Sequence, residues 1–134
     1  TDGGHTEGAG RGSGTELNCY IGKDWGSGNT KLISGVKVWP PNGDDYAPVG
    51  WDSNTGEAAE YVTCVLQGST DNFSSSVVIL GTVFSGVDIN DKSEQSQLSG
   101  FTVTTAYRYH RLHLVTTGGQ WQCCIMEVRF YEEL

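Results

Sequence analysis

The sequence lacks any apolar run of the about 18 residues that a membrane-spanning helix needs. It also has few basic residues, because 8 Lys and Arg stand against 16 Asp and Glu for a formal net charge of −8. That charge disfavours the phosphate backbone of a nucleic acid and an anionic lipid surface. We therefore expect no nucleic-acid partner and no membrane insertion. The charge is compatible with a solvated surface, a cation site or a neutral polar ligand.

Helical periodicity is absent as well: no long window has apolar residues at positions i, i+3, i+4 and i+7. Gly is abundant, and Val, Thr, Tyr and Trp dominate the periodic segments, which is typical of strands joined by loops. A chain of 134 residues suits a single domain spanning 1–134. Because it begins at Thr1 without a methionine, we expect it to be a processed or excised part of a larger protein.

Motifs for catalysis are missing from the sequence. It has no GxSxG nucleophile elbow and no phosphate-binding loop. Asp44 and Asp45 are adjacent on one predicted loop, whereas glycoside hydrolysis needs two carboxylates across a cleft. His110 and His113 are three apart on a predicted strand, so they should face opposite ways and not share a metal. We expect the protein not to be an enzyme.

The four cysteines include no CxxC pair, so a zinc site of the usual spacing is not expected. Alternation along the predicted strands points Cys19, Cys64 and Cys124 toward the core and Cys123 away from it. Two interpretations stay open: buried free thiols, or a disulfide from Cys19 to Cys124 or to Cys64.

The strand pattern is clearest at 60–83, where Val62, Cys64 and Leu66 alternate on one face. A turn-rich link at 68–72 follows, and the apolar block 77–80 is predicted to cross a sandwich core. Residues 84–100 are predicted to be mostly loop. Further strands are expected at 18–25, 31–39, 101–105, 107–115 and 122–132. Val36 and Val38 should point inward from 31–39, and Leu112 and Leu114 from 107–115. About eight strands with irregular spacing favour a two-sheet sandwich or jelly roll.

A long loop at 40–57 contains all three prolines and is long enough to be functional. A sugar site needs flat aromatic faces and planar hydrogen-bonding groups, although each tryptophan could equally cover an end of the core. The predicted ligand-binding residues are Trp39, Asp44, Asp45, Tyr46, Trp51, Asn54 and Trp121.

The Gly-rich segment 1–16 has the composition of a flexible tail. The alternative is a loop around a cation, because Asp2, Thr6 and Glu7 are oxygen donors separated by glycines that let the chain curl.

Five segments, in order, resemble the discoidin family, also called the coagulation factor V/VIII C-domain or galactose-binding-like superfamily, and its carbohydrate-binding modules in particular. They are YIGKDWG (20–26), TKLISGVKV (30–38), VLQGSTDN (65–72), YRYHRLHL (107–114) and IMEVRFYE (125–132). The resemblance implies an eight-stranded antiparallel jelly-roll β-sandwich with long loops.

The same resemblance implies a structural calcium held by Asp2, Thr6 and Glu127, with His5 contributing its carbonyl. The alternative is that Glu127 pairs with an arginine such as Arg129 or Arg111, without a metal. Trp25 stands where the family has a core leucine, which indicates packing. The loop 40–58 has no family counterpart, so no ligand is carried over from it.

Together these features predict a non-catalytic, lectin-like carbohydrate-binding module with a structural calcium. Its partner would be a surface glycan or secreted polysaccharide, and its location extracellular, secreted or on a virion surface. The chief alternative is a structural or adhesive domain of a virion fibre, capsid decoration or extracellular filament. Such a domain would work by protein–protein contacts, as a homo-oligomer or attached to a larger assembly. A third hypothesis is an accessory domain of a glycoside hydrolase.

Overall fold

The computed structural model describes residues 2–6, 17–39, 61–88, 95–97, 101–116 and 123–132. The described residues form strands and turns and contain no helix, which confirms the all-β prediction. The strands are β1 (Asp2–Thr6), β2 (Leu17–Asp24), β3 (Ile33–Trp39), β4 (Tyr61–Ser69), β5 (Val78–Asp88), β6 (Gln95–Gln97), β7 (Tyr109–Thr116) and β8 (Cys123–Glu132). Within this part of the chain there is accordingly no helix that could cross a membrane.

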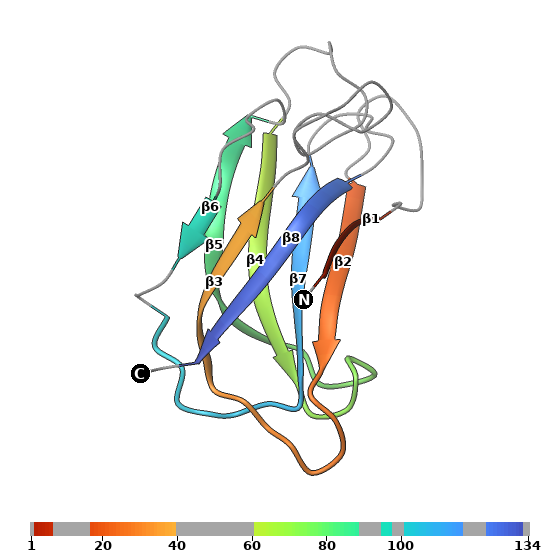
Figure 1. The fold of residues 1–134 in the computed structure, drawn as a ribbon, viewed down its shortest axis with the longest axis vertical. Helices are drawn as coiled ribbons and strands as arrows, with labels where there is room; N and C mark the ends of the chain where they lie inside the picture. The colour runs from red at the N-terminus through yellow and green to blue at the C-terminus, as the bar shows by residue number, and fades with distance from the viewer. Residues whose placement is uncertain are drawn as a thin grey trace.

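The strands form two antiparallel sheets that lie one in front of the other (Figure 1). We call the sheet with the order β1-β8-β3-β6 sheet A and the sheet with the order β2-β7-β4-β5 sheet B. All the strand pairs in both sheets are antiparallel. Most connections pass from one sheet to the other, so neighbours in a sheet are often distant in sequence.

The core lies between the sheets and is built from the inward residues of each. Sheet A contributes Ile33, Val36, Val38 and Val128, all at most 1% exposed. Sheet B contributes a matching set of fully buried residues: Cys64, Leu66, Leu112 and Leu114. The period-2 alternation seen in the sequence therefore identifies the inner face of β3, β4 and β7 correctly.

Cys64 is a free thiol within this core, and burial raises its pKa. The interpretation as a buried free thiol is thus confirmed for Cys64, and a bridge from Cys19 to Cys64 is not formed. The side chains of Cys19, Cys123 and Cys124 lie outside the described residues.

The prediction that 77–80 crosses the core is wrong. Val77, Val78 and Ile79 are 47%, 38% and 70% exposed, and of this block only Leu80 packs against the core. The reason is position: β5 is the outermost strand of sheet B in the strand order, so its first residues have a neighbouring strand on one side only.

Two other boundaries also differ from the prediction. The predicted loop at 84–100 contains the end of β5 and the short strand β6, and Phe84 is buried. The predicted strand at 101–105 is an irregular segment. Its Phe101 ring lies directly over Gly81, where an added Cβ would come within 2.2 Å of the ring. Side-chain burial without a strand partner explains why FTVTT alternates and yet forms no ladder.

Candidate binding site on the outer face of sheet B

The predicted calcium and sugar residues that the structure describes gather on sheet A. The register places Asp2 of β1 opposite Glu127 of β8, and Trp39 of β3 opposite Glu127 on its other side. Positions 2, 127 and 39 therefore form one row across three strands. His5 and Thr6 lie further along β1, opposite Cys124 and Cys123.

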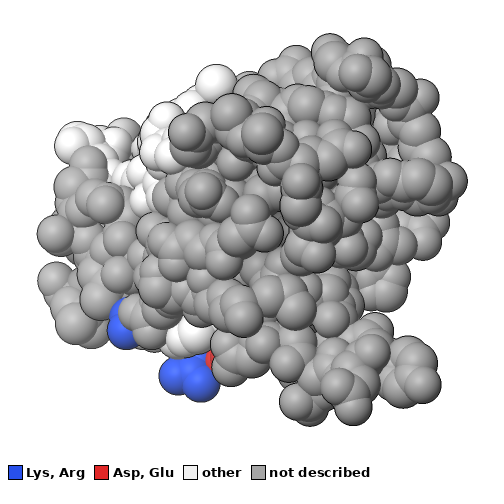
Figure 2. Space-filling view, turned by 90° about the horizontal axis from the view of Figure 1, so that it is seen from above, with Lys and Arg blue, Asp and Glu red and all other residues white. Residues whose placement is uncertain are grey.

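Glu127 has a partner in this row. Its carboxylate accepts a hydrogen bond from Nε of Arg129, two residues along the same strand. This bond raises the pKa of Arg129, whose guanidinium lies 5.0 Å from the centroid of the Trp39 ring. Figure 2 shows described basic side chains, beside an acidic one, at one edge of that view.

One observation supports the calcium hypothesis and another argues against it. Position 2 lies opposite Glu127, as a shared ligand set would need, but the Glu127 carboxylate is already bonded to Arg129. Among the residues whose side chains are described, no group of three His, Cys, Asp or Glu could hold a metal ion. The other predicted ligand-binding residues lie outside the described residues: Asp44, Asp45, Tyr46, Trp51, Asn54 and Trp121.

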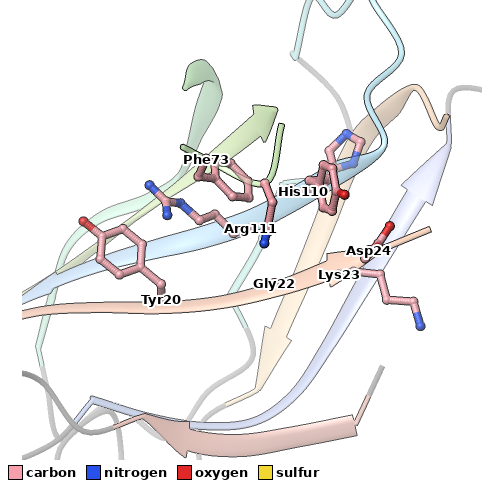
Figure 3. A pocket seen from close by; sticks show the side chains of 9 residues that line it. Tyr20, Gly22, Lys23, Asp24, Phe73, His110 and Arg111 are labelled. Carbon is pink, nitrogen blue, oxygen red and sulfur yellow. The ribbon is translucent and has the colours of Figure 1, made fainter. Parts of the chain in front are cut away.

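A depression of about 330 Å³ lies on the outer face of sheet B. Tyr20 comes from β2, Arg111 from β7 and Phe73 from the turn between β4 and β5. Figure 3 shows the three side chains in a row, with Arg111 between the two rings. Residues from three segments distant in the sequence thus meet at one place.

Arg111 is held on both faces and at one edge. Its guanidinium carbon lies 4.1 Å from the centroid of the Tyr20 ring and 4.0 Å from that of the Phe73 ring. Its Nε donates a 2.7 Å hydrogen bond to Oε1 of Gln67, which is 6% exposed. Burial lowers the pKa of Arg111. Gly22 lies opposite Arg111 on β2 and leaves space for the arginine side chain, since a Cβ added to Gly22 would lie 3.1 Å from the Arg111 Cβ.

The turn that carries Phe73 is shaped by Asp71 and Ser69. The Asp71 carboxylate accepts hydrogen bonds from the backbone N–H and hydroxyl of Ser75, at 3.0 and 2.6 Å, and from the N–H of Ser76 at 3.1 Å. These bonds, chiefly that from the Ser75 hydroxyl, lower the pKa of Asp71 to about 2. The Ser69 hydroxyl oxygen accepts from the N–H of Phe73 at 2.9 Å.

Asn72 and Phe73 occupy the left-handed region, with φ of 56° and 62°. That conformation is rare for a bulky residue such as Phe and persists only where surrounding bonds enforce it. The hydrogen bonds of Ser69 and Asp71 supply this constraint, and the result is that the Phe73 ring covers Arg111.

Further groups stand at the ends of the row. Arg108 donates two hydrogen bonds of 2.8 Å to the Asp24 carboxylate and thereby lowers the pKa of Asp24 to about 2. At the other end the Tyr20 ring stacks on His113 with a 4.6 Å centroid distance.

His110 and His113 both belong to β7. His110 is fully buried on its inner side and His113 stacks on Tyr20 on its outer side, so the prediction that the two histidines face opposite ways is confirmed. Nδ1 of His110 accepts a 2.9 Å hydrogen bond from Nε1 of Trp25, which also packs edge-on against Phe130. Trp25 is thus a packing residue, as predicted. The Nε2 atom of His110 has no hydrogen-bond partner among the described residues, and burial lowers the pKa of His110 to about 4.

Comparison of the chain with models of protein families, with curated proteins and with solved structures finds no match. The depression therefore has to be interpreted from its own chemistry.

Tyr20, Gln67 and Phe73 were not predicted as site residues, and Arg111 was predicted only as an alternative partner of Glu127. The alternation that points Leu112 and Leu114 inward also points Arg111 outward, so one signal was available. Phe73 has no such signal, because its place depends on the path of the turn over the sheet.

Proposed function

We propose that the protein is a non-catalytic carbohydrate-binding domain with a jelly-roll fold. Strand pairs β1/β8, β2/β7, β3/β6 and β4/β5 are nested, as in one long antiparallel hairpin wrapped around a core. This nesting supports the proposed eight-stranded jelly roll and, with it, the discoidin-like architecture.

The observation that carries the proposal is the depression on sheet B. Tyr20 is 44% exposed; Arg111 and His113 lie against its ring, and its exposed part is available for contact with a sugar. Beside it stands a planar hydrogen-bonding group that suits sugar hydroxyls, the Arg111 guanidinium, which Gln67 holds in place from beneath. Ligand sites in general combine apolar walls with a few fixed polar groups. The predicted residues of the 40–57 loop and Trp121 remain proposed as a second part of the ligand contact.

A glycan array probed in calcium and in chelator tests the proposal. We expect binding of a defined set of glycans, lost or weakened by Tyr20→Ala in a protein that still folds. Trp51→Ala should weaken binding without loss of folding if the 40–57 loop takes part; unfolding would make Trp51 a core residue. Absence of any bound glycan in either condition would overturn the carbohydrate-binding function.

The calcium belongs to the proposal as a structural ion near β1 and β8, held by Asp2, Thr6 and Glu127 with the carbonyl of His5. An extracellular, secreted or virion-surface location follows from the ligand class. The register of Asp2 with Glu127 supports the ion, because it places two predicted ligands on neighbouring strands.

A second function, a structural or adhesive domain, is favoured by one observation. Val77, Val78 and Ile79 are exposed at the start of β5, the outermost strand of sheet B in the strand order. Exposed apolar residues on an edge strand can pair with another chain. Self-association in analytical ultracentrifugation, abolished by Ile79→Lys and accompanied by no glycan binding, would favour this function.

A further inference from the structure

Arg111 differs from the other described arginines in its partners. Arg108 is bonded to the Asp24 carboxylate and Arg129 to the Glu127 carboxylate. Within the described part of the chain, the hydrogen bond of Arg111 goes to the neutral amide of Gln67, and no carboxylate pairs with it. A partly buried guanidinium without a counter-charge is costly, so a ligand that supplies a negative charge would be bound favourably there.

The contacts of Arg111 leave the end of its guanidinium group available to a ligand. Tyr20 and Phe73 cover the two faces of the guanidinium, and Gln67 occupies Nε. The remaining donors are the N–H groups of Nη1 and Nη2, which lie in one plane at the end of the side chain. Two parallel N–H bonds from such an end match the two oxygens of a carboxylate.

The local charge favours an anion although the chain as a whole is acidic. Lys23 and Asp24 line the same depression as Arg111, and Asp24 is neutralised by Arg108. The balance of these four side chains is positive, in contrast to the formal net charge of −8. A partly enclosed positive site in a negative molecule concentrates its field on the depression.

We propose that Arg111, clamped between Tyr20 and Phe73 and oriented by Gln67, binds the carboxylate of an acidic sugar such as a uronate. This inference rests on the proposed carbohydrate-binding function and narrows its ligand class. The sugar ring lies against the exposed Tyr20 side of the depression, and the carboxylate meets the Nη groups.

The direct test is a titration of the ¹⁵N-labelled full chain with methyl β-glucuronide, followed by NMR of the arginine side chains. The matched ligand is the methyl ester of the same glycoside, which keeps the hydroxyls and loses the charge. We expect the Nε–Hε signal of Arg111 to shift with the acid and not with the ester. Equal shifts with both ligands, or a shift with neither, would overturn the inference.

The second test is binding of a uronate polymer. It distinguishes failure of this inference from failure of the carbohydrate-binding function. Polygalacturonate should bind the native chain, and Arg111→Gln should weaken it about tenfold or more, the effect of losing a two-bond charged contact. Lys31→Gln is the matched control, because it removes one positive charge from an ion pair with Glu132 outside the depression. Arg111→Lys should not restore binding, since lysine keeps the charge but has no planar fork.

The outcomes are distinct. Neutral glycans bound equally well by the native chain and by Arg111→Gln would overturn the inference and leave the carbohydrate-binding function standing. Stronger binding of a sulfated glycan than of a uronate polymer would overturn the carboxylate assignment. Failure of the native chain to bind any glycan on the array, together with no NMR shift, would overturn both proposals.

Discussion

The outer faces of the two sheets each carry an arginine next to aromatic rings, and they differ in what neutralises it. On sheet A, Arg129 lies over Trp39 and is bonded to Glu127 of the same strand. On sheet B, Arg111 lies between Tyr20 and Phe73 and is bonded to the amide of Gln67. The same residue types thus produce a neutral pair on one face and, among the described residues, a cation without a carboxylate partner on the other. The difference explains why we assign the ligand to sheet B.

The sheets also differ in their buried polar side chains. The buried polar side chains of the described residues, Gln67, Ser69 and His110, all belong to sheet B. His110 is surrounded by Trp25, Tyr107 and Phe130 at ring distances of 6.1 to 6.4 Å. Sheet B should therefore be the acid-sensitive half of the molecule.

The largest expected effect is the loss of stability on acidification. The pKa of His110 is lowered to about 4 in the folded chain, so the unfolded chain binds more protons as the pH falls from about 6.5. The stabilisation is complete above about pH 6.5 and is lost as the pH falls through 4, a change of about 3 kcal/mol in the free energy of unfolding. Since Trp25 donates to Nδ1, protonation also breaks that hydrogen bond.

Urea unfolding as a function of pH measures this effect, with His110→Gln as the variant that should flatten the profile between pH 4 and about 6.5. Hydrogen exchange near pH 5 should show β2 and β7 opening before β3 and β8. Equal opening of both sheets, or an unchanged profile in the variant, would contradict the assignment to His110.

The second largest effect is expected from giving Arg111 a counter-charge, the feature that distinguishes Arg129 on sheet A from Arg111 on sheet B. Gln67→Glu places a carboxylate against Nε of Arg111 and so reproduces the arrangement of Arg129 with Glu127. We expect the affinity for a uronate ligand to fall about tenfold or more, because the introduced carboxylate competes for the guanidinium and repels the ligand. Calorimetry measures the affinity, and a melting curve at the same pH verifies folding. An affinity equal to that of the native chain would place the ligand elsewhere.

A smaller effect is expected from the turn that holds Phe73. Asp71→Asn removes the negative charge that Ser75 and Ser76 bond, and with it the constraint on the left-handed residues. The melting temperature should fall by a few degrees and the ligand should bind more weakly, as the Phe73 ring leaves Arg111. Thr70→Ala, an exposed neighbour in the same turn, is the control and should change neither quantity. A fall in melting temperature without any change in affinity would remove Phe73 from the site.

The smallest effect is expected on sheet A without calcium. The side chains of Arg129 and Glu127 are 57% and 37% exposed, and ion pairs at the surface contribute little to stability. Glu127→Gln should therefore leave the melting temperature in chelator almost unchanged. If calcium binds there, the native chain should melt higher in calcium than in chelator, and Glu127→Gln should abolish that difference. Identical melting of the native chain in calcium and chelator would remove calcium from the proposal.

The core positions of sheet B could be predicted from the sequence only in part. The alternation around Cys64 and Leu66 and around Leu112 and Leu114 predicted the inner face of sheet B, because side-chain direction in a strand has period 2. The block 77–80 was assigned to the core on apolarity alone, and only its place at the sheet edge leaves Ile79 exposed.

The contacts of the candidate site could likewise be predicted only in part. Trp25 was predicted to pack from the resemblance to the discoidin family, and the two histidines were predicted to face apart from their spacing. The pairing of Glu127 with Arg129 instead of Arg111 required the assignment of β7 and β8 to different sheets. Nothing local in VLQGSTDNFSS indicates that the Phe73 ring covers an arginine about 40 residues away in sequence.

By itself, the sequence determined the all-β class, the direction of alternating side chains and the acidic charge of this protein, because these depend on composition and on period-2 geometry. The tertiary structure alone decided which strands became edges, which carboxylate reached which arginine, and where Tyr20, Phe73 and Arg111 meet. The physical reason is that strand order and the path of a turn over a sheet are set by contacts between distant segments, and these contacts leave no periodic trace in the chain.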